Sequence, residues 1–293
     1  MYLVTGASGH LGQLVISNLL EIHKIPASKI IATSRKPETL ATLKARGVDV
    51  RAADFDDTGN LVKAFKGATR LLLISTDAMD RPGHRLEQHK NAIAAAEKAG
   101  VEHVLYTSMP KPETSAVLFA PDHLGTEKAL AASGLKGWTV LRNNWYFENL
   151  LHSLPHAIKS GTWYTAAGEG KIAHIAREDL ARAAAAALAS DNGGKNTYTL
   201  TGAQEYTTGE IAKLVSDAVG KPISVVQVPL EGLVQGMVGA GFPEPVARVF
   251  GSFDTNVNQG GLSGVTGDYK KLTSNDNTPF ASWLAKNKQA FLG

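Results

Sequence analysis

The chain has 293 residues, a formal net charge of +3, 43% hydrophobic residues and no cysteine. The missing cysteine excludes disulfides, cysteine nucleophiles and thiolate metal sites, and a near-neutral chain without a basic run gives no reason to expect nucleic acid as a partner. The length fits one large domain or two unequal ones.

The first predicted elements are a strand over residues 1–4 and a helix over 10–23, joined by "TGASGHLG". Its spacing is G-x-x-G-x-x-G. The first glycine would permit a tight turn, the second would let backbone approach phosphates, and the third would let the helix pack closely. A plain strand–helix turn is the alternative, but the position favours a dinucleotide's pyrophosphate at the helix N-terminus. The cofactor-binding residues predicted in this turn are Gly6, Ser8, Gly9, His10, Leu11 and Gly12.

Strand-like and helix-like runs then alternate over the first half of the chain. This alternation predicts the α/β class, as a Rossmann-like doubly wound parallel sheet, with an NAD(P)-binding domain over residues 1–145. The predicted strands cover 29–34, 48–53, 70–75, 103–108 and 138–143, and the predicted helices cover 37–46, 57–66, 84–100 and 122–134.

The rhythm changes after "LRNNWYFEN", and residues 146–293 are interpreted as a smaller α+β substrate lobe that shares a core with the first domain. We expect this lobe to cover the carboxyl edge of the sheet, where open α/β folds bind ligands. Residues 109–121, which contain three prolines, are a candidate lid. The lobe's predicted helices cover 178–190, 207–220, 230–240, 243–251 and 279–290, its strands 197–202 and 223–229, and a Gly- and Asn-rich loop 253–272.

The end of the second strand predicts which dinucleotide binds. An NAD-preferring site places an acidic residue there, whereas this chain has Ser34 and Arg35, with Lys36 behind them. An Arg fork bonds a 2′-phosphate, so NADPH is favoured over NADH, unless Arg35 is only a solvated helix-start residue. Further cofactor contacts are predicted at Asp54 and Phe55 near the adenine and, at the ends of the next two strands, at Ile74, Ser75, Thr76, Thr107 and Ser108.

Several segments together carry a family resemblance: the glycine turn, "SRKPE", "RLLLIS", "HVLYTS", "HLGTEKAL" and "LRNNWYFEN". With these, the chain resembles the NmrA-like group of atypical short-chain dehydrogenase/reductases over nearly its whole length. Within that group it is most similar to the type 2 NAD(P)H:quinone oxidoreductases and triphenylmethane reductase. The resemblance implies NADPH-dependent reduction of quinones without flavin.

Ordinary members of the superfamily use Tyr-x-x-x-Lys, in which the Tyr protonates a carbonyl. Lys128 matches the Lys, but Leu124 stands where the Tyr would be, and His123, one position earlier, is not assumed to replace it. The missing acid suits an acceptor that takes hydride readily, such as a quinone or a cationic triarylmethane dye. Holding the nicotinamide against a flat acceptor is then the protein's main task.

The segment "RNNWYFEN" follows the sixth strand and should lie beside the nicotinamide. We predict Asn143, Lys128 and Tyr146 as catalytic residues, with Lys128, Arg142 and Asn143 also binding cofactor. Aromatic side chains can wall a flat pocket, although hinge packing between the two lobes is an alternative use for them. The predicted substrate contacts are Asn144, Trp145, Tyr146 and Phe147.

Two alternative functions stay open. One is a non-catalytic NADP(H)-sensing regulator, since such members of the group also lack the Tyr; the other is a reductase of a triarylmethane dye, enone or phenylpropanoid. The histidines lack metal-ligand spacing, so no metal is expected. We expect neither a signal peptide nor a membrane segment, a cytoplasmic location, a small planar electron acceptor as partner, and a monomer or homodimer.

Overall fold

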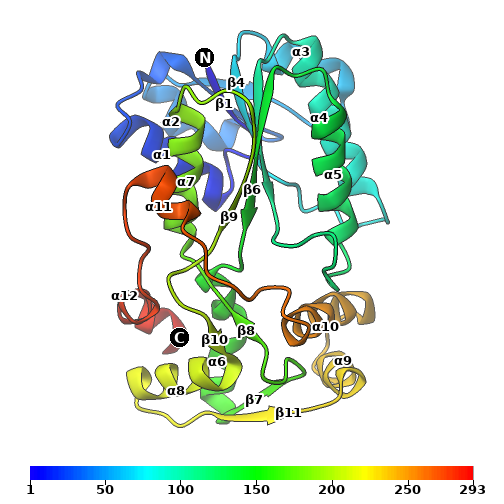
Figure 1. Ribbon diagram of the computed structural model, residues 1–293, viewed down its shortest axis with the longest axis vertical. Helices are drawn as coiled ribbons and strands as arrows, with labels where there is room; N and C mark the ends of the chain where they lie inside the picture. Colours follow the sequence, from blue (N-terminus) through cyan, green and yellow to red (C-terminus); the bar gives the residue numbers. More distant parts are fainter. Residues whose placement is uncertain (293) are drawn as a thin grey trace.

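A seven-stranded sheet forms the centre of the molecule, and the computed structural model describes residues 1–292 of the chain (Figure 1). All its neighbouring strands are parallel, in the order β3-β2-β1-β4-β5-β6-β9. The strand order reverses between β1 and β4, which makes that point the ligand-binding edge of such a sheet. The α/β prediction is therefore confirmed. The strands are β1 Tyr2–Val4, β2 Ile30–Ser34, β3 Asp49–Ala52, β4 Arg70–Leu73, β5 His103–Ser108, β6 Gly137–Asn143 and β9 Lys195–Leu200.

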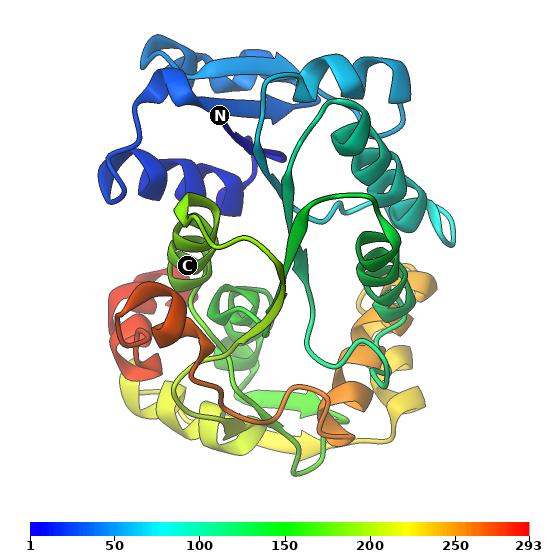
Figure 2. The same ribbon diagram turned by 45° about the horizontal axis from the view of Figure 1, so that its top comes forward.

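Helices cover both faces of the sheet, and each strand alternates its side chains between them. Leu3 and Ile31 pack in the cluster that contains the inner residues of α3, α4 and α5, while Val4 and Ile30 pack with α1 and α7. Figure 2 shows these two helix layers on opposite sides of the strands. The helices of the two layers are α1 His10–Glu21, α2 Ala41–Ala45, α3 Thr58–Phe65, α4 His84–Lys98, α5 Ala120–Ala132 and α7 Arg177–Ala189.

The predicted helix over 37–46 is two shorter pieces, a 3₁₀ turn Pro37–Leu40 followed by α2. A second 3₁₀ turn, Ala27–Lys29, leads into β2. The other four helices predicted in the first half are confirmed within a few residues, because their apolar residues recur at helical spacing.

The chain returns to the sheet after its first excursion into the lobe. Strand β9 pairs in parallel with β6, with Tyr198 beside Leu141, and α7 packs against α1. Residues 177–200, which the sequence assigned to the smaller lobe, therefore complete the sheet and its helix layer. The division of the chain at 145/146 stays a prediction. It did not include the return of α7 and β9 to the sheet.

The remaining elements form a lobe below the carboxyl ends of the strands in Figure 1. A separate core of aromatic and aliphatic residues, which includes Phe147, Phe280 and Trp283, holds it together. None of the helices within residues 1–292 is long and apolar enough to cross a bilayer. The lobe consists of the 3₁₀ turn Phe147–Asn149, α6 Leu150–Ser160, β7 Thr162–Thr165, β8 Lys171–Ile172, β10 Tyr206–Thr207, α8 Thr208–Val219, β11 Ser224–Gln227, α9 Leu230–Gly239, α10 Glu244–Asn258 and α12 Phe280–Leu292. Helix α11 Asp268–Thr273 instead packs against α7 and β9 of the sheet domain.

The predicted loop over 253–272 is wrong at both ends. Helix α10 continues to Asn258, and α11 lies inside the predicted loop. One of the asparagines that suggested a loop, Asn256, is a buried polar partner instead. Asn256 is completely buried, and its Oδ1 accepts a hydrogen bond from the backbone N–H of Ala116 at 3.2 Å. By contrast, the capping box of α8 at Thr207 and Glu210 is present as predicted.

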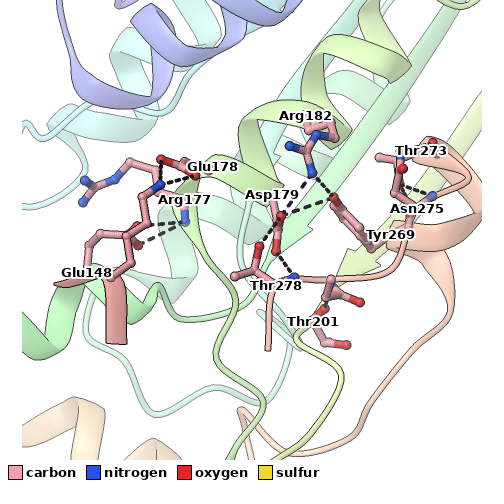
Figure 3. Close-up of polar contacts among 12 residues, drawn as sticks. Glu148, Arg177, Glu178, Asp179, Arg182, Thr201, Tyr269, Thr273, Asn275 and Thr278 are labelled. Carbon is pink, nitrogen blue, oxygen red and sulfur yellow. Dashed lines mark hydrogen bonds and ion pairs between the residues drawn. The ribbon is translucent and has the colours of Figure 1, made fainter. Parts of the chain in front are cut away.

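A buried carboxylate fastens the C-terminal segment onto the sheet domain (Figure 3). Asp179 on α7 accepts hydrogen bonds from the backbone N–H of Thr278 at 2.7 Å, the Thr278 hydroxyl at 3.0 Å and the Tyr269 hydroxyl at 3.3 Å. Arg182 lies 3.5 Å from the same carboxylate. These contacts fix the connection between α11 and α12.

Candidate functional site

The glycine turn has the geometry that a phosphate cradle needs. Gly6 adopts φ +57°, which side-chain-bearing residues rarely adopt. A Cβ on Gly12 would lie 2.4 Å from the Gly6 carbonyl oxygen, so only glycine lets α1 approach the turn this closely. A Cβ on Gly9 would meet only that same oxygen, at 3.4 Å, which leaves open space beside the turn. No side chain caps the N-terminus of α1 and no acidic residue lies in its first turn, so its N–H groups suit an anion.

The two strands beside β1 hold this turn in place. The Thr5 hydroxyl donates to the Leu72 carbonyl at 3.1 Å and accepts from the Ile74 N–H at 3.0 Å. On the other side, the hydroxyls of Ser8 and Ser34 lie 3.0 Å apart. The turn is therefore preorganised against the ends of β2 and β4, next to the two predicted contacts Ser34 and Ile74.

Arg35 lies beyond the end of β2, where the second ribose of a dinucleotide is expected. Its side chain is 69% exposed, and the nearest carboxylate, that of Asp77, lies 3.8 Å away and is itself 88% exposed. Such an exposed pair is weak, so the guanidinium is free to take a phosphate instead. At the predicted adenine end, Oδ1 of Asp54 accepts from the Asp56 N–H, and Phe55 packs against the core.

The ends of β4 and β5 hold the next group of predicted residues together. The Thr107 hydroxyl accepts from the backbone N–H of Ser75 at 2.9 Å, and the Thr76 N–H donates to Nε2 of His89 at 3.0 Å. The Thr76 hydroxyl is buried and has no partner among the described residues.

Ser108, Arg142 and Lys128 do not converge with these groups. The Ser108 hydroxyl donates to the Glu127 carboxylate at 2.6 Å, and Arg142 Nε donates to the same carboxylate at 3.0 Å. Arg142 also pairs with Glu113. Lys128 is exposed on α5 and makes no hydrogen bond within residues 1–292. Arg142 thus links β6 to α5 through Glu127, and to the loop before α5 through Glu113.

The residues at the end of β6 and just after it differ in the partners that their side chains have. Asn143 is 7% exposed, and its Oδ1 is buried without a hydrogen-bond partner among residues 1–292. Burial raises the pKa of the Tyr146 phenol, which keeps it protonated. Asn144, in contrast, donates to the Leu262 carbonyl at 3.0 Å and accepts from the Trp145 N–H at 2.7 Å, so it joins two segments of the lobe.

The aromatic residues that follow also take different places. Phe147, predicted to contact a planar acceptor, is 3% exposed and packs on Phe280 and Trp283, at centroid distances of 5.0 and 5.2 Å. Trp145 lies edge-on to Phe253 at 4.6 Å, and Phe253 contacts Phe119 at 5.9 Å. These three rings lead from Trp145 to Phe119, in the segment that follows β5. Phe147 instead belongs to the core of the lobe.

The candidate lid packs down onto α10 and the segment after it. Besides the bond from Ala116 to Asn256, the Leu118 N–H donates to Ser252 at 3.3 Å, and Lys111 Nζ donates to the carbonyls of Gly260 and Ser263. The segment 109–121 therefore bridges the sheet edge and the lobe.

The sequence interpretation missed a buried polar cluster behind these residues, formed by Arg85, His89, Tyr106, His123 and Thr126. Arg85 Nη2 donates to His123 Nε2 at 3.1 Å, and His123 Nδ1 lies 2.8 Å from the Tyr106 hydroxyl. His89 Nδ1 lies 2.9 Å from the Thr126 hydroxyl. In the sequence, the cluster could have been suggested only through Tyr106, whose polar ring follows the apolar Val104 and Leu105 in β5.

Burial determines the charge of this cluster. Desolvation lowers the pKa of His89 to about 3 and that of His123 well below its ordinary value, and the positive charge of Arg85 adds to both effects. Desolvation also raises the pKa of Tyr106. Both histidines are therefore neutral at physiological pH, and Arg85 is the cluster's positive charge. No group of three His, Asp or Glu residues within 1–292 is arranged to hold a metal ion.

Comparison with known proteins agrees with this geometry. The model of the NmrA-like family matches residues 2–280. Quinone oxidoreductase 2 of Escherichia coli is 36% identical over 281 residues, which cover 96% of each chain. The NADPH complex of the Escherichia coli NADPH-dependent quinone oxidoreductase superposes with a TM-score of 0.92 at 35% identity, covering 99% of this chain and 100% of that one. The NADP(H) complex of Citrobacter sp. triphenylmethane reductase gives 0.91 at 36%, with the same coverage.

Proposed function

The chain belongs to the NmrA-like family, and on that premise we propose that it is an NADPH-dependent reductase that delivers hydride, without flavin, to a quinone or a similar planar electrophile. The observation that carries this proposal is the uncapped glycine turn followed by the free Arg35, in a chain whose full length matches NADPH-bound reductases.

The residues present fit NADP(H). Gly6, Gly9 and the first turn of α1 would hold the pyrophosphate, and Arg35 would bond the 2′-phosphate. Asn143 has an unpartnered buried oxygen that can accept from the amide of the nicotinamide. When bound, the cofactor supplies a hydride.

The protein's own contribution would be to position the acceptor and exclude water. Leu124 occupies the place of the usual proton donor. Burial raises the pKa of the Tyr146 phenol, so that this group stays protonated. An acceptor that becomes an aromatic phenolate needs no strong acid at the moment of transfer, so a protein built this way suits quinones and electron-poor dyes.

A location in the cytoplasm and a monomeric or homodimeric state are part of the same proposal. The relatives named for quinone and dye reduction support a small-molecule acceptor, and the physiological acceptor would be chosen by residues of the lobe such as Trp145.

The test is the loss of NADPH absorbance with a simple benzoquinone, after confirming that no flavin copurifies and subtracting the uncatalysed rate. Rapid consumption of NADPH, and slower consumption of NADH, is the expected result. Tight binding of NADPH without turnover of any quinone, enone or dye would favour the NADP(H)-sensing regulator instead.

A further inference from the structure

Arg85 is a buried cation without an ion-pair partner. The residue is 8% exposed, and within residues 1–292 its guanidinium makes one hydrogen bond, to the neutral His123. The charges of Asp122 and Asp77 act on Arg85 at longer range, but within residues 1–292 neither carboxylate forms an ion pair with it. The carboxylates closest in sequence pair elsewhere: Asp80 with His84 and Glu87 with Arg81. Burying a charge is costly unless something compensates it, so this arrangement calls for an anionic or strongly polar partner from outside the chain.

The position of Arg85 places that partner at the candidate site. Arg85 is the second residue of α4, which follows the loop at the end of β4. Its guanidinium carbon lies 4.8 Å from the centroid of Phe119, the ring that continues the chain from Trp145 and Phe253.

The surrounding hydrogen bonds hold Arg85 in one orientation. His123 Nε2 accepts from Arg85, so neutral His123 carries its proton on Nδ1 and donates to the Tyr106 oxygen. His89 Nε2 accepts from the Thr76 N–H, so His89 donates from Nδ1 to the Thr126 hydroxyl, which itself donates to the Asp122 carbonyl at 2.7 Å. These bonds hold His123 in one tautomer, which orients the Arg85 guanidinium that donates to it.

Unpartnered polar atoms gather at the same edge of the sheet. Within residues 1–292, six buried side-chain polar atoms lack a hydrogen-bond partner, and three of them belong to Thr76, Arg85 and Asn143. Thr76 follows β4, Arg85 lies in the first turn of α4 and Asn143 ends β6. All three therefore come from elements at the carboxyl edge of the sheet, where β5 lies between β4 and β6. A ligand with polar atoms would satisfy all three.

We propose that Arg85 binds the acceptor's oxygen and stabilises the negative charge that appears on it, an inference that rests on the proposed function. The acceptor gains a hydride with its two electrons at one carbonyl oxygen, and the dinucleotide is oxidised. The ring becomes aromatic as the π electron pair of the opposite carbonyl moves onto its oxygen, which forms a phenolate, and water then supplies the proton. A fixed cation in a dry site stabilises this charge without having to reorganise. The same cation would repel a triarylmethane dye, whose positive charge disappears on reduction.

The first test measures binding, without turnover. Calorimetry compares 4-nitrophenolate, an analogue of the anionic product, with neutral nitrobenzene on wild type, Arg85→Gln, Arg85→Lys and Arg81→Met. Gln keeps a donor for His123 but lacks the charge, Lys keeps the charge, and Arg81→Met removes an exposed arginine that pairs with Glu87. We expect Arg85→Gln to lose the preference for phenolate by about tenfold or more, and Arg81→Met to retain it.

The inference is overturned if wild type does not prefer phenolate, or if Arg85→Gln weakens both probes equally. Should Arg85→Gln not fold, Arg85→Lys decides, because it must still prefer phenolate to nitrobenzene.

The second test uses turnover. Arg85→Gln should lower kcat/KM for a benzoquinone by about 10²-fold and leave unchanged or raise that for a cationic triarylmethane dye. An equal fall for both acceptors indicates a merely structural role and contradicts the inference. Wild type that consumes NADPH with neither acceptor would contradict the proposed function, while the phenolate measurement would still decide the role of Arg85.

Discussion

At the scale of single residues, Arg35 is the residue that we propose to determine cofactor preference. Its exposed side chain has one weak partner, Asp77. Arg35→Asp should weaken NADPH binding by about tenfold to a hundredfold, because a charge-assisted hydrogen bond becomes a repulsion, and should change NADH binding little. Fluorescence titration with both dinucleotides measures this, with Arg46→Asp as an exposed control. Equal weakening of both would contradict a 2′-phosphate role.

Asn143 is the second such residue. In the proposed mechanism its buried oxygen, unpartnered among residues 1–292, accepts a hydrogen bond from the nicotinamide amide. Asn143→Ala should therefore lower kcat about tenfold or more with little change in NADPH affinity. Steady-state kinetics and a dinucleotide titration separate these effects, and the exposed Asn192→Ala is the control. Unchanged kcat would remove Asn143 from the site.

The same scale shows where sequence reasoning ends. Asn144 and Phe147 have the residue types expected of a planar pocket, yet their partners are Leu262, Phe280 and Trp283, residues more than a hundred positions away. Arg85 had no local signal at all, because nothing in a helix sequence distinguishes a buried arginine from a solvated one. Polar chemistry is visible in sequence, whereas the burial that gives it meaning depends on distant contacts.

At the scale of elements, the glycine turn separates a folding requirement from a binding requirement. Gly12→Ala should lower the free energy of unfolding by about 1–3 kcal/mol, since its Cβ would collide with the backbone of Gly6 and Ala7. Gly9→Ala should leave stability nearly unchanged and weaken NADPH binding, because the open space beside Gly9 is where phosphates are expected. Urea unfolding and dinucleotide titration of both variants test this, and an unchanged affinity in folded Gly9→Ala would be the contrary result.

The connection between α11 and α12 depends on Asp179. Asp179→Ala would leave buried donors of Thr278 and Tyr269 unpaired, so we expect the free energy of unfolding to fall by about 3 kcal/mol. Its neighbour Glu178, exposed and paired with Lys286, is the matched control, and Glu178→Ala should cost less than about 1 kcal/mol. Similar losses in urea unfolding for the two variants would show that Asp179 does not fasten the segment.

Elements with strong local patterns were predictable, and those decided by partners were not. The first six strands and the capping box of α8 follow from period and end signals. Helix α10 extends past its predicted end, where Oδ1 of the buried Asn256 accepts from the Ala116 N–H, and the place of β9 beside β6 depends on a pairing across about fifty residues. Neither partner can be read from the segment itself.

At the scale of the whole molecule, buried histidines connect stability to pH. Desolvation lowers the pKa of His89 to about 3, of His103 to about 4 and of His174 to about 3, from an ordinary value of 6.5. Below that ordinary value the unfolded chain takes up protons that the folded chain cannot. Stability is therefore complete above about pH 6.5 and falls as the pH decreases, by up to about 1.4 kcal/mol per pH unit for each histidine.

His84 acts in the opposite sense. Hydrogen bonds to Asp80 and then Asp56 raise its pKa, so its contribution is complete below 6.5 and is lost as the pH rises through the raised value. Urea unfolding across pH should show a maximum near neutrality and a steep acid side. A flat profile between pH 7 and pH 5 would mean that the buried histidines are protonated in the folded protein.

The return of β9 to the sheet also has a consequence for how the protein is made. The cofactor-binding half is incomplete until residue 200 has been synthesised, because β6 has no outer neighbour and α1 lacks its covering helix before then. In the nascent chain, β6 therefore has an unpaired edge while α6 and the elements between it and β9 are synthesised. A dinucleotide already present in the cell could bind the turn early, but the folded sheet that fixes it is a late product of translation.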